Sequence, residues 1–278
     1  MNIVDAVILG VVEGLTEFLP VSSTGHLTIA EKLLGLKVND QSVTAFTAII
    51  QMGAIVAVVV YFWRDISRLV AVWCRGLFNK SVRHTFDYRF SWYVIAGSVP
   101  IGVVGLAAKS LISGPLRSLW VVAGALVLWS AVMIFAERVA PQQRTEREMT
   151  FGDVMFVGVA QCIALVPGVS RSGATISAGL LRDFDRVSAT RLSFFLSIPA
   201  LTAAGALEAV SESDAISSGV GWTPTLVGIV VSFIVGYASI AWLLKFVSHH
   251  SIGKFSWYRI PAGLLLAGLL AAGVMSAT

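Results

Sequence analysis

The sequence predicts an all-α polytopic membrane protein: an inverted-topology repeat with six transmembrane helices and two re-entrant helix–loop–helix hairpins. Three observations predict it: an apolar composition, six long apolar runs and an internal duplication. Of the 278 residues, 56% are apolar and 13% are charged, and the mean hydropathy is +0.81. Soluble domains have about 25% charged residues, so this chain has too few polar groups to cover a water-soluble globule. The same figures exclude a disordered chain.

Six apolar runs are long enough to cross a bilayer, which takes about 20 helical residues. Tryptophans lie near the ends of most of these runs, where membrane proteins carry their aromatic belts. We therefore expect transmembrane helices at residues 43–63, 91–109, 118–137, 190–210, 224–247 and 257–276.

Two further apolar regions are interrupted by loops of proline, serine and glycine. Residues 2–36 are broken by PVSSTG at 20–25, and residues 152–182 are broken by PGVSRSG at 167–173. At 1.5 Å per residue, the two halves of the second region reach roughly 22 and 15 Å, short of a hydrocarbon core about 30 Å thick. We expect both regions to be re-entrant hairpins, because irregular backbone is tolerated at that depth only inside protein or beside a wet cavity.

The two broken regions are copies of each other. GVVEGLTEFLPVSSTG (10–25) aligns without gaps to GVAQCIALVPGVSRSG (158–173), at an offset of 148 residues. The single membrane domain, 1–278, therefore divides into repeat 1 (1–138) and repeat 2 (150–278), each with one hairpin and three spans. Because three is odd, the second repeat enters the membrane upside down. Many transporters share this architecture and bind their ligands where the broken helices meet.

Basic residues are distributed unequally between the two sides that this topology defines. One side holds 15 of them and the other holds four. By the positive-inside rule, the side with more basic residues is cytoplasmic. The same rule accounts for the net charge of +4, so we expect no nucleic-acid partner. The cytoplasmic loops are 64–90, 138–152, 182–191 and 245–259.

Few ionisable residues remain at membrane depth, and all of them belong to the hairpins: Glu13, Glu17, His26 and Arg171. Each costs at least a few kcal/mol there, so each is a candidate functional residue. Glu13 and Glu17 are four residues apart, so on a helix their carboxylates face one way, about 6 Å apart. This pair suits a divalent cation, Mg²⁺ or Ca²⁺, or acid–base chemistry. The alternative is that one carboxylate merely pairs with Arg171.

The loop of each hairpin is typical of a phosphate cradle. Proline stops the first helix, serine caps the second, and the free N–H groups of the second helix attract anions. Arg171 adds a planar fork that fits phosphate oxygens. Two such loops meeting head to head would hold two adjacent phosphates, whereas in the plainer alternative the hydroxyls only cap helices. The candidate diphosphate-binding residues are Ser22, Thr24, Gly25, Ser170, Arg171, Ser172, Gly173 and Thr175.

His26 directly follows the first loop. Three roles are open to it: a general acid for a leaving phosphate, a base that activates a serine, or a structural histidine.

These motifs resemble those of a known family. EGLTEFLPVSSTGH (13–26) and PGVSRSGATIS (167–177) are similar to the two signature motifs of the bacterial undecaprenyl-diphosphate phosphatases of the bacitracin-resistance type, and the resemblance covers nearly the whole chain. It implies a hydrolase that converts undecaprenyl diphosphate to undecaprenyl phosphate and inorganic phosphate, which recycles the lipid carrier for peptidoglycan and other wall polymers. It also implies bacitracin resistance, dependence on Mg²⁺ or Ca²⁺, and an active site that opens toward the outer, periplasmic face of the bacterial plasma (inner) membrane.

The resemblance also assigns roles to residues. The family's glutamate motif falls on Glu13 and Glu17, its essential serine and histidine on Ser23 and His26, and its arginine on Arg171. We expect Ser23 to be the nucleophile, activated by His26 or Glu17, with a metal-activated water as the rival chemistry. The expected partners are undecaprenyl diphosphate and membrane lipid, and the oligomeric state is open, a homodimer included. The alternative function is an inverted-repeat transporter or flippase of polyprenyl phosphate.

Overall fold

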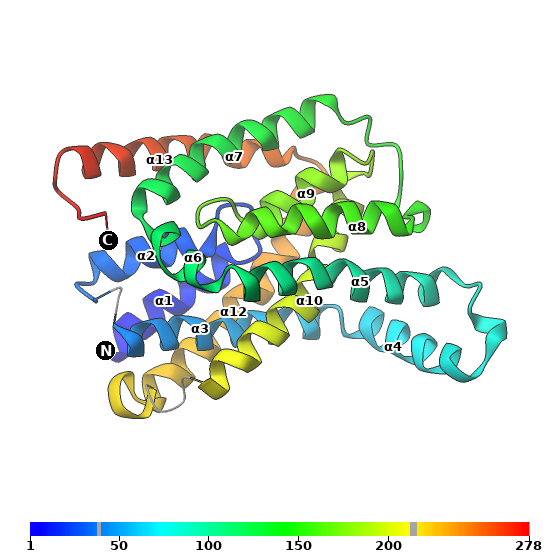
Figure 1. Ribbon diagram of the computed structural model, residues 1–278, viewed down its shortest axis with the longest axis horizontal. Helices are drawn as coiled ribbons and strands as arrows, with labels where there is room; N and C mark the ends of the chain where they lie inside the picture. Colours follow the sequence, from blue (N-terminus) through cyan, green and yellow to red (C-terminus); the bar gives the residue numbers. More distant parts are fainter. Residues whose placement is uncertain (38–39, 212–215, 278) are drawn as a thin grey trace.

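The computed structural model describes residues 1–37, 40–211 and 216–277, and this part of the chain is almost entirely helical (Figure 1). Most helices run along the long axis of the molecule, and the two termini lie at the same end. The one isolated β-bridge in the described residues joins Arg144 to Phe184.

Five helices in the described residues are long and apolar enough to cross a membrane, so the chain is a polytopic membrane protein. They correspond to the first five predicted spans, and each begins or ends within a few residues of the predicted bounds. These helices are α3 (Gln41–Tyr61), α5 (Phe86–Ala107), α7 (Leu119–Val139), α10 (Arg186–Ser211) and α12 (Trp222–Val247).

The sixth predicted span, 257–276, is not a full-length one. Its helix, α13 (Ser256–Ala271), has 16 residues, which at 1.5 Å per residue reach about 24 Å. The chain then turns at Gly273, whose φ is +70°. The tail folds back so that the carbonyl of Ala277 accepts a hydrogen bond of 2.9 Å from the Leu119 N–H. This long-range contact ends the helix before the apolar sequence ends.

Both predicted broken regions are pairs of short helices. The first is α1 (Ile3–Thr16) and α2 (Ser23–Leu33). The second is α8 (Phe151–Ala160), extended by the 3₁₀ helix η4 (Gln161–Leu165), and α9 (Arg171–Leu180). A capping box fixes the start of α1 at Asn2 and that of α8 at Thr150. We call the loops between these helices, residues 17–22 and 166–170, the first and second tip.

Two further helices, α4 and α6, precede α7 in the sequence and belong neither to the broken pairs nor to the long spans. The amphipathic helix α4 (Trp63–Phe78) follows α3 directly and packs against the first half of α5. Arg68 of α4 holds Asp87 of α5 in an ion pair of 3.1 Å. The short helix α6 (Lys109–Ser113) lies at the opposite end of the bundle (Figure 1).

Glycines let several helices approach each other closely. A Cβ atom added to Gly158 of α8 would lie 2.1 Å from the carbonyl oxygen of Gly97 on α5, and one added to Gly53 of α3 would lie 2.2 Å from the carbonyl oxygen of Ile229 on α12. Small residues at helix contacts are typical of membrane bundles, whose packing relies on close backbone approach. In this packing α12 lies along α1 and α3, while α5 lies along α8 and α10.

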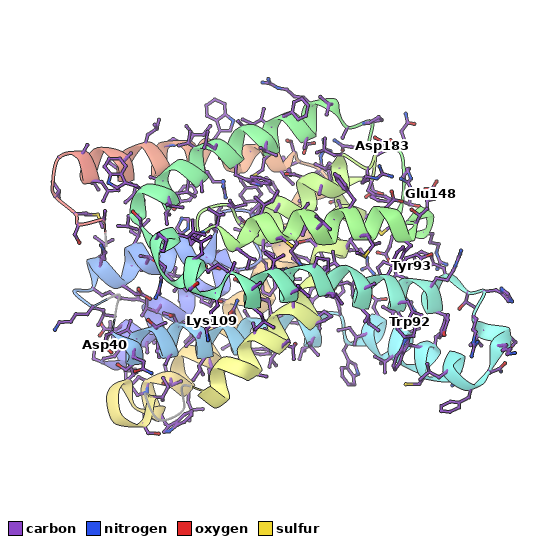
Figure 2. The ribbon with its side chains drawn as sticks, in the orientation of Figure 1. Asp40, Trp92, Tyr93, Lys109, Glu148 and Asp183 are labelled. Atoms are coloured by element: carbon purple, nitrogen blue, oxygen red, sulfur yellow. The ribbon has the colours of Figure 1, made fainter. Side chains whose placement is uncertain are left out.

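Ion pairs gather at the end of the bundle where Figure 2 shows Glu148 and Asp183, opposite Asp40 and Lys109. Asp153 accepts hydrogen bonds from Arg144 and Arg182, both with a shortest N–O distance of 2.7 Å. The hydrogen bond to Asp153 raises the pKa of the Arg144 guanidinium. This network ties the start of α8 to the end of α9.

Candidate active site

The two tips touch each other. The N–H of Gly168 in the second tip donates a hydrogen bond of 3.1 Å to Ser22 Oγ in the first. Ser170 Oγ lies 3.5 Å from the carbonyl oxygen of Leu19. Residues 146 and 151 positions apart in the chain are thus in direct contact, as the duplication predicts.

The two tips also share a backbone conformation that serine rarely adopts. Ser22 has φ +79°, and Ser170, its counterpart at the offset of 148, has φ +78°. Each directly precedes a helix, α2 or α9. Positive φ costs energy for any residue with a Cβ, and such strain concentrates at functional sites. Both helices therefore start from the same strained turn.

A single carboxylate joins the first residues of these two helices. Ser23, which begins α2, donates a hydrogen bond of 2.6 Å from Oγ to Glu17 Oε2. Arg171, which begins α9, donates one of 3.2 Å from Nη2 to Glu17 Oε1. Glu17 is only 6% exposed. The structure thus brings together the predicted serine, glutamate and arginine in a buried cluster between two helix N-termini.

Arg171 keeps donors for a further ligand. Its Nη1 reaches the carbonyl oxygen of Ser193 on α10 at 3.3 Å, but its buried Nε has no hydrogen-bond partner in the described part of the protein. A guanidinium has five N–H donors, and an unsatisfied buried donor costs free energy. An anion beside Arg171 would remove that cost.

Glu13 is the more deeply buried of the two predicted acidic residues. It is 1% exposed, and its Oε1 has no hydrogen-bond partner among the described residues. Glu17 and Arg171 are its charged neighbours. A buried, unpaired carboxylate oxygen fits a cation ligand, because a cation would supply the missing partner. The described residues contain no group of three His, Cys, Asp or Glu residues that could complete a metal shell.

His26 lies near the first tip, but its ring is hydrogen-bonded to residues other than Ser23. Its Nδ1 donates a hydrogen bond of 2.7 Å to the carbonyl oxygen of Ser22, and its Nε2 lies 2.7 Å from the hydroxyl of Tyr258 on α13. Because a carbonyl oxygen can only accept, Nε2 of the neutral ring accepts from Tyr258. Of the two predicted bases for Ser23, only Glu17 is within hydrogen-bond distance of it here.

The remaining predicted phosphate ligands divide into two groups. Ser170 Oγ caps α9 by accepting from the Gly173 N–H at 3.2 Å and is 3.1 Å from Ser172 Oγ, while Thr175 Oγ1 donates to Ser193 Oγ at 2.6 Å. Ser170 therefore caps a helix, and the hydroxyls of Ser172 and Thr175 also have partners within the protein. Thr24, by contrast, is exposed on the first turn of α2.

Gly25, also on the first turn of α2, has room for no side chain. A Cβ atom there would lie 2.9 Å from Val122 Cγ1 on α7. Glycine therefore lets the first turn of α2 pack against α7.

Arg259 is a site residue that the sequence analysis missed, because it was counted in the cytoplasmic loop 245–259. It lies in α13 and is fully buried. It donates hydrogen bonds of 2.9 Å to the carbonyl oxygens of Pro20 in the first tip and Gly168 in the second. One side chain thus holds both tips. Without Arg259, the number of basic residues on the side predicted to be cytoplasmic is 14 instead of 15. A signal was present: Arg259 stands inside the predicted span.

Comparison with known proteins gives a consistent result along the whole chain. A family model described as "Bacitracin resistance protein BacA" matches residues 6–265. The chain is 58% identical to "Undecaprenyl-diphosphatase 3" of Frankia casuarinae over 278 residues, which cover all of both chains. It is 54% identical to "Undecaprenyl-diphosphatase" of Cutibacterium acnes over 284 aligned residues, again covering both chains. It is 46% identical to "Undecaprenyl-diphosphatase 2" of Corynebacterium jeikeium, with 100% of this chain and 99% of that protein covered.

Proposed function

The chain belongs to the bacitracin resistance protein BacA family, and we propose that it hydrolyses undecaprenyl diphosphate to undecaprenyl phosphate and inorganic phosphate. This reaction returns the lipid carrier to peptidoglycan and wall-polymer synthesis, and the family's description links it to bacitracin resistance. The single observation that supports it most strongly is the cluster in which Glu17 accepts hydrogen bonds from both Ser23 and Arg171.

The diphosphate binds where the two tips meet. The first-turn N–H groups of α2 and α9 have no intrahelical acceptor, and both helix dipoles favour an anion there. Arg171 offers its unpaired Nε–H together with an Nη–H, the two-donor geometry that suits phosphate oxygens. The prenyl chain leaves the site sideways between helices into the lipid.

Ser23 attacks the terminal phosphorus. Its Oγ–H proton passes to Glu17 Oε2, the acceptor already 2.6 Å away. The new Oγ–P bond forms as the bond from that phosphorus to the bridging oxygen breaks, and undecaprenyl phosphate leaves with the bonding electrons. Glu17 passes the proton it took from Ser23 to the departing undecaprenyl phosphate and is again a free carboxylate. Water then attacks the phosphoserine and gives its proton to Glu17, and Glu17 returns this proton to Ser23 Oγ as the Oγ–P bond breaks and inorganic phosphate leaves. Arg171 offsets the negative charge that develops on the phosphoryl oxygens.

Direct attack by water is the rival chemistry, and it uses the same residues differently. Glu17 would then accept the proton of the water, and Ser23 would orient a phosphoryl oxygen or the water itself. His26, bonded to Ser22 and Tyr258, positions the first tip in either version.

A divalent cation, Mg²⁺ or Ca²⁺, fits this site through Glu13, whose buried Oε1 lacks a partner, with Glu17 beside it. When bound, the cation would neutralise phosphate charge, with phosphate oxygens and water as its other ligands.

We further propose that repeat 1 (1–138) and repeat 2 (150–278) are inverted copies with re-entrant hairpins in the bacterial plasma membrane. The matching φ values of Ser22 and Ser170 support this, as does the packing of α1 on α12 and of α8 on α5. The 14-to-4 distribution of basic residues supports a cytoplasmic position for the ion-pair end. The resemblance to the family implies an active site that opens toward the outer face, and we propose the same for this chain.

The direct test is phosphate release from undecaprenyl diphosphate by the purified protein in detergent, with and without a chelator. We expect one phosphate per lipid, no release from undecaprenyl phosphate, and loss of turnover in chelator. A polyprenyl phosphate carrier would release no phosphate, so the absence of release with cation present would refute the hydrolase.

A further inference from the structure

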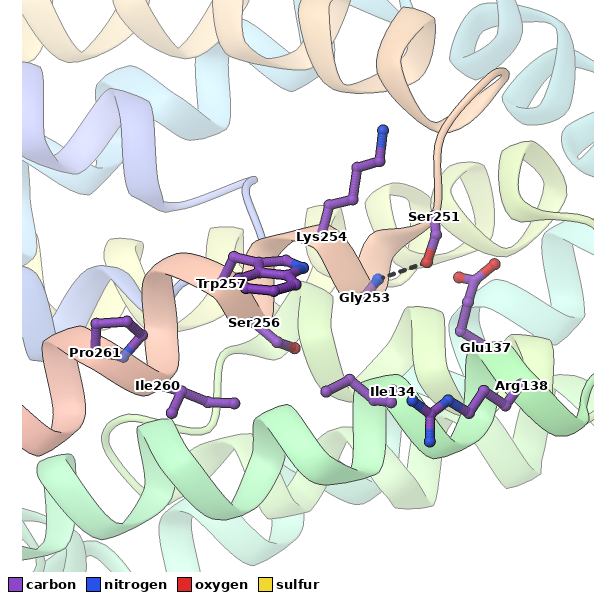
Figure 3. Close-up of a pocket in the computed structure, with 10 residues that line it drawn as sticks. All are labelled: Ile134, Glu137, Arg138, Ser251, Gly253, Lys254, Ser256, Trp257, Ile260 and Pro261. Carbon is purple, nitrogen blue, oxygen red and sulfur yellow. Dashed lines mark hydrogen bonds between the residues drawn. The ribbon is translucent and has the colours of Figure 1, made fainter.

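A cavity lies away from the tips, between the end of α7 and the start of α13. Its volume is about 520 Å³. Figure 3 shows Ile134 of α7 and Ile260 of α13 between the two helices, Arg138 beside α7, and Lys254 extending from the turn before α13. The lining of the cavity therefore combines apolar side chains with the basic residues Arg138 and Lys254.

The two basic lining residues have no acidic partner among the described residues. The one acidic lining residue, Glu137, is already ion-paired with Arg186 and accepts a hydrogen bond of 3.2 Å from the Ile252 N–H. Arg138 and Lys254 are exposed, and neither makes an ion pair or side-chain hydrogen bond within residues 1–37, 40–211 and 216–277. Two free cations beside one cavity favour an anionic ligand.

The rest of the lining indicates a lipid. Trp257 is 84% exposed, and a tryptophan at the first turn of a membrane helix is typical of headgroup depth. Pro261 has no N–H for the carbonyl of Trp257, one turn earlier, so that carbonyl can accept from a headgroup hydroxyl. A soluble anion would gain nothing from the tryptophan and isoleucine surfaces.

This cavity is separate from the proposed active site. At 100° per residue, Trp257, Ile260 and Pro261 occupy one face of α13, while Tyr258 and Arg259 occupy the other. Tyr258 contacts His26, and Arg259 holds the tips. One face of α13 thus lines the cavity, while the other contacts the residues of the proposed active site.

We propose that this cavity binds an anionic phospholipid of the surrounding membrane, with Arg138 and Lys254 at its phosphate and Trp257 and Ile260 along its first acyl carbons. Basic pockets between membrane helices bind such headgroups in other proteins. Each cation near the membrane surface strengthens binding roughly fivefold, so the pair accounts for about a 30-fold preference.

The test is native mass spectrometry of the full-length protein in neutral detergent, titrated with phosphatidylglycerol or with phosphatidylcholine of the same acyl chains. The wild type should retain one phosphatidylglycerol roughly 30-fold more tightly than phosphatidylcholine. The double variant Arg138→Gln/Lys254→Gln should lose this preference and keep its thermal unfolding midpoint in lipid-free detergent.

The matched control is Arg75→Gln/Lys80→Gln, which removes two exposed positive charges from α4 and the following turn. It should bind phosphatidylglycerol as the wild type does. Equal weakening in the control would show a diffuse charge effect and overturn the proposal. Equal retention of phosphatidylcholine by the wild type, or displacement of phosphatidylglycerol by millimolar inorganic phosphate, would overturn it as well.

Discussion

The hydroxyl of Ser23 donates a hydrogen bond of 2.6 Å to the carboxylate of Glu17, across the tip that separates α1 from α2. This contact exists because the chain reverses at the strained residue Ser22. It places a hydroxyl and a carboxylate together at the start of a helix, where an anion is also favoured, and in the proposed mechanism they act as nucleophile and base.

Removing this hydroxyl tests the role of Ser23. We expect Ser23→Ala to lower kcat for phosphate release by at least about 100-fold, because the nucleophile is lost. Ser67→Ala, on the exposed face of α4, is the control and should match the wild type. Full turnover by Ser23→Ala would instead favour direct attack by water.

The buried carboxylate of Glu13 predicts how the enzyme responds to metal. Glu13→Gln keeps the shape of the side chain but removes its charge, so the Mg²⁺ concentration for half-maximal activity should rise by about tenfold or more. A titration of activity with Mg²⁺ after chelation measures this. Glu148→Gln, in an exposed capping box, should leave the titration unchanged. An unchanged curve for Glu13→Gln would remove Glu13 from the cation site.

Arg259 should contribute to stability as well as to activity. Arg259→Met would leave the carbonyl groups of Pro20 and Gly168 without their donor, at a cost of about 2–4 kcal/mol. We expect a lower midpoint of thermal unfolding in detergent and reduced phosphate release. Lys245→Met, an exposed residue near the end of α12, is the control for loss of charge. Equal midpoints for the two variants would show that Arg259 does not hold the tips together.

The contact between α5 and α8 predicts a difference between two glycines of α8. Gly158→Ala would place a methyl group 2.1 Å from the carbonyl oxygen of Gly97 and should destabilise the protein by about 2 kcal/mol or more. Gly152→Ala has only a contact of 3.9 Å and should not destabilise it. The midpoints of thermal unfolding of the two variants measure this difference. Equal midpoints would contradict the close packing of α5 and α8.

The sequence predicts much of the site because the site is built from local repeats. Glu13 and Glu17 follow helix spacing, and the offset of 148 residues pairs Ser22 with Ser170. The sequence does not show whether His26 or Glu17 is the base for Ser23. The answer depends on the contact of His26 with Tyr258, which lies 232 residues away in the chain.

Two predictions failed for a similar reason. Arg259 was assigned to a loop because a cation at the edge of an apolar run ordinarily lies at the membrane surface. Its partners are carbonyl groups of both tips, about 90 and 239 residues away. Helix α13 is shorter than predicted because its tail folds back onto α7. The position of Arg259 inside the predicted span was a local signal, but the partners in both contacts are distant in the sequence and no local pattern identifies them.

The central claim is that hydrolysis takes place where the two tips meet. The measurement that tests it most directly is the initial rate of phosphate release from undecaprenyl diphosphate by two variants. These are Arg171→Ala, at the start of α9, and Arg182→Ala, two residues past its end. Arg171→Ala should lose at least about 100-fold in kcat/KM, because it removes the guanidinium that we propose binds the phosphates. Arg182→Ala should stay close to the wild type, because Asp153 keeps Arg144 as a partner. A wild-type rate for Arg171→Ala would contradict this account of the site.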